Sequence, residues 1–85
     1  MILVIETRKL YDTVFTNEED RVKYENDKLL FCKPEVNKKL QEYLKSAGPE
    51  DLTSISTLTF DTWKDYEQAA KDCSLPGSYY IKEIK

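Results

Sequence analysis

The spacing of the apolar positions changes along the chain, and each spacing predicts a different element. Residues 1–7, MILVIET, form an almost continuous apolar run, which indicates an inner strand with apolar side chains on both faces. Residues 9–16, KLYDTVFT, are rich in β-prone residues and are predicted to continue that strand after a bend or bulge. The polar stretch TNEED at 16–20 then predicts a turn.

Residues 21–31, RVKYENDKLLF, are predicted to form a β-hairpin. Val22 and Tyr24 alternate with charged residues, and an Asn-Asp pair supplies the turn before the chain returns through Leu-Leu-Phe. A short helix beginning at Thr16, with Glu19 completing a capping box, is the alternative. The two-residue spacing of Val22 and Tyr24 suits a strand better than a helix face, so the hairpin is preferred.

Residues 34–47 show the strongest helical pattern in the chain. Pro34 fits the first helical position, and the Gly48-Pro49 pair ends the helix. The apolar positions recur at helical spacing on one face. This predicted inner face consists of Val36, Leu40, Tyr43, Leu44 and Ala47.

A strand and a second helix are predicted to follow. Residues 51–60, DLTSISTLTF, are β-branched and indicate a strand. Thr59 or Asp61 is expected to cap a helix at about 61–73. Its predicted inner face consists of Trp63, Tyr66, Ala70 and Cys73, with Ala69 at the margin.

The last strand is predicted at 78–84, after the helix-breaking LPG at 75–77. The alternation along this strand places Tyr79 and Ile81 on one face and Tyr80 and Ile84 on the other. The order of elements predicts an α+β fold of one domain, 1–85, with a mainly antiparallel sheet of about four to five strands and two helices packed on one face. The two strands of the unit at 53–84 are candidates for a parallel pair joined by a right-handed crossover.

Composition restricts the functional classes. The chain is 40% hydrophobic and 34% charged with a net charge of −3, which indicates a soluble globular domain without a general attraction to nucleic acid or anionic membranes. The N-terminal apolar run is short and has no basic leader, so neither a signal peptide nor a membrane span is expected. We therefore expect a cytoplasmic protein with reduced cysteines and no membrane partner.

Few residues could perform chemistry. The chain has no histidine, and its only glycines are Gly48 and Gly77, so no His-containing metal site, Cys–His pair or Gly-rich phosphate loop is present. Cys32 lies just before a predicted helix, where a thiol pKa is lowered, but it follows Leu-Leu-Phe and has no imidazole base. We interpret Cys32 and Cys73 as packing residues, with a disulfide between them only in an oxidising compartment. No cofactor or metal is expected, and a small enzyme using Cys32 or a carboxylate is the least favoured class.

Charge is segregated along the chain. Residues 17–27 carry a net −3, residues 28–47 a net +3 and residues 48–76 a net −4. The basic segment suggests a lysine patch that could contact phosphates or an acidic protein, whereas the second predicted helix carries an acidic stripe. A solvated face is the plain alternative for both. The candidate residues are Lys33, Lys38, Lys39 and Lys45 for the patch and Asp61, Asp65 and Asp72 for the stripe.

Aromatic side chains on the strands offer a second kind of contact. If helices cover only one face of the sheet, some strand tyrosines are exposed on the other face, where they suit protein contact, self-association or base stacking. Packing within the fold is the alternative. The candidate residues are Tyr11, Tyr24, Tyr79 and Tyr80.

The segments RVKYENDK and TFDTWKDYEQAAKDC resemble those in small accessory proteins of large tailed phages. Lysine outnumbers arginine eleven to two, which is also typical of AT-rich genomes in general. Many such phage proteins block host toxins or defence enzymes by binding them. The resemblance implies an antitoxin-like inhibitor in the host cytoplasm.

Together these features favour a non-catalytic protein that inhibits or regulates a macromolecular partner through surface complementarity. A protein partner is preferred, with homodimerisation as a further form of protein contact. The alternative is an RNA-associated accessory factor that uses the lysine patch, and a nucleoprotein partner would satisfy both hypotheses.

Overall fold

The computed structural model describes residues 1–25 and 33–85. Within these residues three strands and five helices form an α+β fold, as predicted. They follow one another as β1 (Ile2–Glu6), α1 (Thr7–Val14), α2 (Glu18–Glu25), α3 (Pro34–Ser46), α4 (Pro49–Ile55), β2 (Leu58–Phe60), α5 (Trp63–Lys71) and β3 (Tyr79–Glu83). No helix in the described part of the chain is both long enough and apolar enough to cross a membrane.

The sheet is antiparallel, with β1 at its centre and the strand order β2-β1-β3. Val4 of β1 lies opposite Leu58 of β2 on one side and Ile81 of β3 on the other. Because both neighbours are antiparallel to β1, β2 and β3 run in the same direction and are joined by a crossover through α5. The predicted parallel orientation of these two strands is therefore confirmed, although β1 lies between them.

β1 is central because its apolar residues can be buried on both faces. The four residues from Ile2 to Ile5 are each at most 1% exposed. Leu3 and Ile5 pack into the main core, and Ile2 and Val4 point to the opposite face, which carries α5. The predicted inner strand is thus confirmed.

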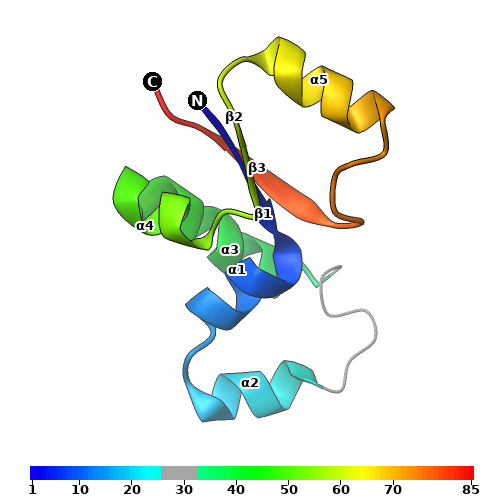
Figure 1. Ribbon diagram of the computed structural model, residues 1–85. Coiled ribbons are helices and arrows are strands. Elements are labelled where there is room, and N and C mark those ends of the chain that lie inside the picture. The colour runs from blue at the N-terminus through cyan, green and yellow to red at the C-terminus, as the bar shows by residue number, and fades with distance from the viewer. Residues whose placement is uncertain (26–32) are drawn as a thin grey trace.

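Helices lie on both faces of the sheet, with α5 on one side and α3 and α4 on the other (Figure 1). The main core is formed by the second group and by α1, which packs against α3. The predicted face of α3 is confirmed, since Val36, Leu40 and Leu44 are buried and Tyr43 and Ala47 pack beside them. The expectation that two helices pack on one face of the sheet is wrong.

The region from 7 to 25 is helical rather than extended, so the predicted strand at 9–16 is wrong. In α1, Leu10 and Tyr11 are buried, and Tyr11 stacks on Phe15 at a centroid distance of 4.6 Å. The β-prone side chains of this segment are accommodated in a helix because it packs on α3, and that packing outweighs local propensity.

The hairpin predicted at 21–31 is also wrong where the structure describes it. Residues 18–25 form α2, which supports the alternative of a short helix, and residues 26–32 lie outside the described part. Val22 is 67% exposed, whereas Tyr24 is buried and its ring meets Phe15 edge-on at 5.8 Å. α2 lies beyond α1, away from the sheet (Figure 1).

The strand predicted at 51–60 is confirmed only at its end. Pro49 begins α4, and two acidic residues follow it in the first turn, where they interact favourably with the helix dipole. Leu52 is the residue that α4 buries. Because α1, α2 and α4 take up segments predicted as strands, the described sheet has three strands instead of four to five.

Candidate functional site

Four aromatic side chains from β2, α5 and β3 form a cluster on the face of the sheet that carries α5. Tyr66 lies at its centre and meets its neighbours edge-on, with centroid distances of 6.1 Å to Phe60, 5.7 Å to Trp63 and 6.5 Å to Tyr79. Edge-on contacts of this kind stabilise ring pairs beyond the area they bury. We call Phe60, Trp63, Tyr66 and Tyr79 the α5 aromatic cluster.

Polar contacts fix the orientation of these rings. The hydroxyls of Tyr66 and Tyr79 share a hydrogen bond of 2.8 Å, and Trp63 Nε1 donates to Glu83 Oε2 at 2.8 Å. The hydrogen bond to Tyr79 is the main reason that the pKa of the Tyr66 phenol lies above its ordinary value, and desolvation raises it further. Both contacts join α5 to β3, so the helix is held at a defined position over the sheet.

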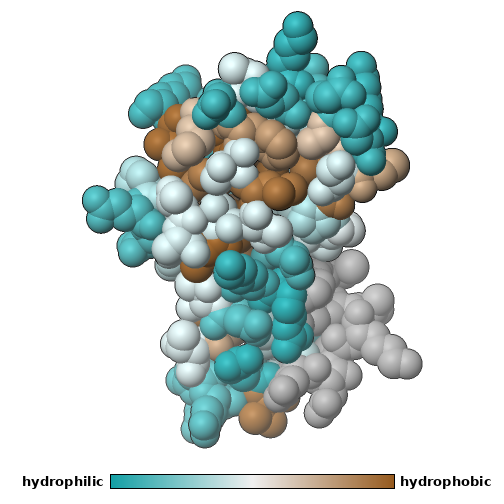
Figure 2. All heavy atoms as spheres, in the orientation of Figure 1, coloured by the Kyte–Doolittle hydropathy of each residue, from teal (hydrophilic) through white to brown (hydrophobic). Residues whose placement is uncertain are grey.

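The cluster is only partly covered. α5 has no buried side chain, Trp63 is 44% exposed, and the other three rings are half-buried. Figure 2 shows hydrophobic surface gathered in the upper part of the molecule, around the level of β2 and α5, with hydrophilic residues around it. The prediction that the inner face of this helix belongs to the core is therefore wrong for Trp63, Ala70 and Cys73, which are exposed.

The start of α5 is set by Thr62, and not by Thr59 or Asp61 as expected. The Thr62 hydroxyl accepts a hydrogen bond from the backbone N–H of Asp65 at 3.2 Å, which is the usual N-cap contact. Trp63 is the first residue of the helix, so this cap also determines where the indole emerges.

The three aspartates of the predicted acidic stripe are exposed and lie on or beside α5. Asp61 and Asp65 flank Trp63 in sequence, at the N-terminal end of the helix. Asp72 follows the helix and accepts hydrogen bonds from Gln68 Nε2 at 3.2 and 3.3 Å. The structure therefore combines the acidic stripe with the α5 aromatic cluster in one region.

The four lysines of the predicted patch lie in different environments. Lys38 and Lys45 are exposed on α3. Lys39 lies 3.7 Å from the carboxylate of Asp20 and 5.3 Å from the centre of the Phe15 ring, so it connects α3 to α2 and α1. Lys33 precedes α3 and is half-buried. Lys38 and Lys45 remain as exposed candidates for an external anion.

The four candidate tyrosines separate into two pairs. Tyr11 and Tyr24 are buried in the main core at 1% and 7% exposure, so their expected position on an exposed sheet face is wrong. Tyr79 and Tyr80 lie on β3 as predicted and point to opposite faces. Tyr80 packs against the main core, its hydroxyl donates to Asn37 Oδ1 at 2.6 Å, and burial raises its pKa. Only Tyr79 belongs to the α5 aromatic cluster.

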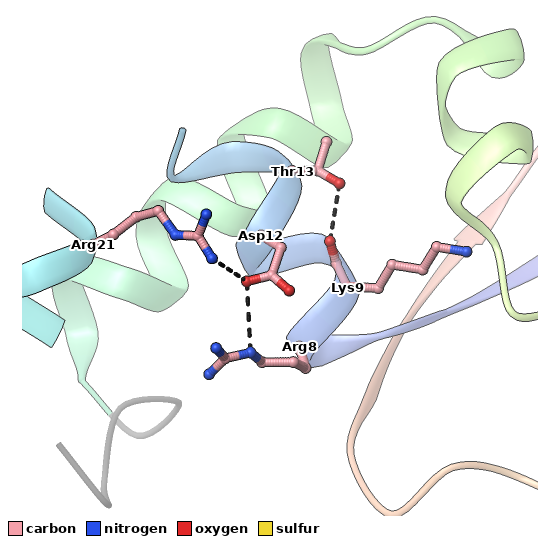
Figure 3. Close-up of polar contacts among 5 residues, drawn as sticks. All are labelled: Arg8, Lys9, Asp12, Thr13 and Arg21. Atoms are coloured by element: carbon pink, nitrogen blue, oxygen red, sulfur yellow. Dashed lines mark hydrogen bonds and ion pairs between the residues drawn. The ribbon is translucent and has the colours of Figure 1, made fainter. Parts of the chain in front are cut away.

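Both arginines of the chain form ion pairs with the carboxylate of Asp12. Asp12 Oδ1 lies 3.1 Å from Arg21 Nη2 and 3.5 Å from Arg8 Nε, and these three side chains converge between α1 and α2 (Figure 3). Thr13 bonds back to the carbonyl of Lys9, whose ammonium extends away from the group (Figure 3). This group links α1, where a strand was predicted, to α2, which matches the alternative of a short helix.

Of the two cysteines, the structure describes Cys73. Cys73 is exposed with a backbone φ of 57°, so the prediction that it packs in the core is wrong. Cys32, interpreted as a packing residue, lies outside the described residues. Among residues 1–25 and 33–85, no three cysteine or acidic side chains come together in a way that could hold a metal ion.

Tyr79 was predicted as a contact residue, but Phe60, Trp63 and Tyr66 were missed, in the case of Trp63 and Tyr66 because the sequence assigns the apolar side of α5 to the core. The nearest sequence signal is the Thr-Trp pair after a short strand, which places a large ring in the first turn of a capped helix. The chain matches no protein-family model and has no significant match among curated proteins or solved structures.

Proposed function

We propose that the chain is a non-catalytic binding protein that inhibits or regulates a macromolecular partner by covering part of its surface. The α5 aromatic cluster provides the apolar centre of the contact, and the acidic stripe provides its rim. The observation that carries this proposal is the 44% exposure of Trp63 within a ring cluster whose orientation is fixed by hydrogen bonds.

Trp63 has the properties of a binding anchor. Tryptophan and tyrosine are enriched among the residues that dominate binding energy, because they bury a large area for a small loss of rotamer freedom. The hydrogen bond to Glu83 restricts the indole before any partner arrives, which reduces the ordering cost further. A partner with an apolar pocket would therefore gain most of its affinity at this ring.

A protein partner with a basic rim suits this region better than RNA. Asp61 and Asp65 lie two residues before and two residues after Trp63 in the chain, where their carboxylates would repel phosphate groups and attract lysine or arginine. The resemblance to small phage accessory proteins supports a more specific form of the proposal, in which the partner is a host toxin or defence enzyme.

The direct experiment compares what three forms of the full chain capture from cells of the native host, with nuclease treatment and mass spectrometry. Trp63→Ala should lose the partner recovered by the wild-type chain, with affinity reduced about thirtyfold or more, since truncation of such an anchor costs roughly 2 kcal/mol or more. Val22→Ala is the matched control, because Val22 is exposed on α2 and lies outside the cluster. A partner retained equally by Trp63→Ala, or released by nuclease, contradicts the proposal.

The single tryptophan provides a second measurement. Binding of the purified partner should shift the Trp63 emission to shorter wavelength, because the half-exposed indole leaves water. Asp72→Lys should weaken this binding and reduce its salt dependence, while a basic residue at the helix C-terminus is favourable for the fold. An unchanged emission spectrum at saturation would show that the partner binds elsewhere.

The alternative function, an RNA-associated accessory factor, is favoured by the exposure of Lys38 and Lys45 on α3. RNA binding through two such lysines should weaken steeply as salt is raised and should be reduced in a Lys38→Ala/Lys45→Ala variant. No measurable RNA binding by the wild-type chain at low salt would eliminate this function.

A further inference from the structure

β3 forms an outer edge of the sheet. It pairs with β1 on one side, and among the described residues no strand pairs with its other side. β3 has five residues, whereas the opposite edge strand, β2, has three. An unpaired edge of this length offers a row of backbone donors and acceptors to another strand.

The pairing with β1 determines which backbone groups point outward. Met1 and Ile84 exchange hydrogen bonds of 2.9 and 2.8 Å, and the N–H of Thr7 donates to the carbonyl of Ser78 at 3.1 Å. Backbone groups alternate in direction along a strand, so the even-numbered residues of this stretch bond to β1. The N–H and C=O groups of Tyr79, Ile81 and Glu83 consequently point away from the sheet.

We propose that β3 pairs with β3 of a second copy of this chain, antiparallel and about a two-fold axis through Ile81. In this register Ile81 lies opposite Ile81 of the second copy, and Tyr79 lies opposite its Glu83. Every outward backbone group of the strand then has a partner, and the two sheets join into one of six strands. This inference does not depend on the proposed function, because it uses the outward backbone groups of β3, whereas the proposed contact uses side chains on the face of the sheet that carries α5.

The side chains and charges select this register and a second copy as the occupant. Lys82 lies opposite Tyr80 of the second copy, so its ammonium group can lie over an aromatic ring. Moving the axis to position 82 or 83 would set Lys82 against Lys82, or Glu83 against Glu83, and like charges directly opposite are destabilising. Moving it to position 80 leaves the outward groups of Glu83 without their counterparts on β3. Pairing about Ile81 also covers the half-buried Ile81 side chain with its own copy.

The first test is sedimentation of the full chain over a range of concentrations. The wild-type protein should approach twice its chain mass of 10.0 kDa. Ile81→Pro should weaken dimerisation at least about thirtyfold, because one outward N–H is removed from each copy. The β1 ladder is retained, since the N–H of residue 81 does not take part in it. Ile81→Val is the matched control and should remain dimeric.

A wild-type chain that stays monomeric at every concentration overturns the proposal, as does a dimer that Ile81→Pro leaves unchanged. The first result would also be the one expected if this edge instead accepts a peptide strand from another protein. Circular dichroism verifies that Ile81→Pro folds.

The second test does not require a proline. In a Cys32→Ser/Cys73→Ser background, Ile81→Cys should form a covalent dimer under mild oxidation. Directly opposed residues in such a pair have Cα atoms about 5.5 Å apart, within the range that a disulfide spans. Glu83→Cys is the control, because its two copies would be about 13 Å apart along the strands. Cross-linking at least about tenfold faster at position 81 supports the register, and equal rates contradict it.

Discussion

The C-terminus of α5 contains a residue in an unfavourable backbone conformation, and replacing it should stabilise the protein. Cys73 has a φ of 57°, and no other non-glycine residue in the described part of the chain has a positive φ. Its N–H bonds to the carbonyl of Ala70 at 3.2 Å, and the N–H of Ser74 bonds to that of Ala69 at 3.0 Å. This is the Schellman arrangement, in which the position of Cys73 is usually occupied by glycine.

The magnitude follows from two opposing terms. A residue with a Cβ loses about 1–2 kcal/mol in the left-handed region. Glycine loses roughly 0.5–1 kcal/mol more backbone entropy on folding than other residues do. Cys73→Gly should therefore raise the free energy of unfolding by about 0.5–1 kcal/mol, which corresponds to roughly 2–8 °C in the melting temperature for a domain of this size.

Thermal unfolding under reducing conditions measures this effect, with Cys73→Ala as the control. Alanine removes the thiol but keeps the Cβ and the left-handed strain, so its melting temperature should stay near that of the wild-type protein. Because Cys73 is exposed, loss of the thiol should itself cost little. A Cys73→Gly protein that melts at or below the temperature of Cys73→Ala would refute the assignment of strain to this position.

Three further predictions concern the cap, the core and alkaline pH. Thr62→Ala should destabilise the protein by about 1 kcal/mol in urea unfolding, whereas Thr62→Ser should retain most of the N-cap bond. Leu40→Ala, at a fully buried position of α3, should cost roughly 2–5 kcal/mol, and a smaller loss would show that the core around it can collapse. Burial raises the pKa of Tyr80 in the folded state, so its contribution to stability is present below the unfolded pKa of about 10 and is lost as pH rises through the folded value. Urea titrations on either side of that pH should show a smaller loss of stability for Tyr80→Phe than for the wild-type chain.

Elements whose local signals agree with one another were predictable from the sequence. In α3, Pro34 at the first position, apolar residues at helical spacing and a following Gly-Pro pair all indicate the same helix, and the structure has it at Pro34–Ser46. β1 and β3 were also predicted. The continuous apolar run of β1 suits a strand buried on both faces, and the alternating run of β3 suits a strand whose two faces lie in different environments.

Elements whose local and tertiary preferences differ were not predictable. The residues of α1 include Thr7, Tyr11 and Val14, which favour strands locally. Burial of Leu10 and Tyr11 against the rest of the core is gained only in the assembled fold. The same applies to α4. The β-branched residues after Pro49 favour a strand locally, although the segment forms a short helix that packs beside β1.

The candidate site was predictable in its charges and, of its rings, in Tyr79 alone. The aspartates of α5 are exposed, as a polar helix face indicates. The apolar face of α5 was assigned to the core because helical spacing shows which side is apolar but not how much sheet is available to cover it. The described part of the chain contributes three strands rather than four to five, so this sheet is too narrow to enclose Trp63, and the indole is left partly in water.

The two layers of the fold differ in how completely their side chains are buried. On the side of α1, α3 and α4, large side chains such as Leu10 and Leu40 are fully buried, so truncating them should mainly reduce stability. On the side of α5, no helical residue is buried, and Trp63 and Tyr66 are held by hydrogen bonds to β3 instead. Substitutions there remove less buried area and should mainly affect binding. Under the proposed function this surface stays available to a partner and cannot also be closed as a core, which would give a physical reason for α5 to cover the sheet incompletely.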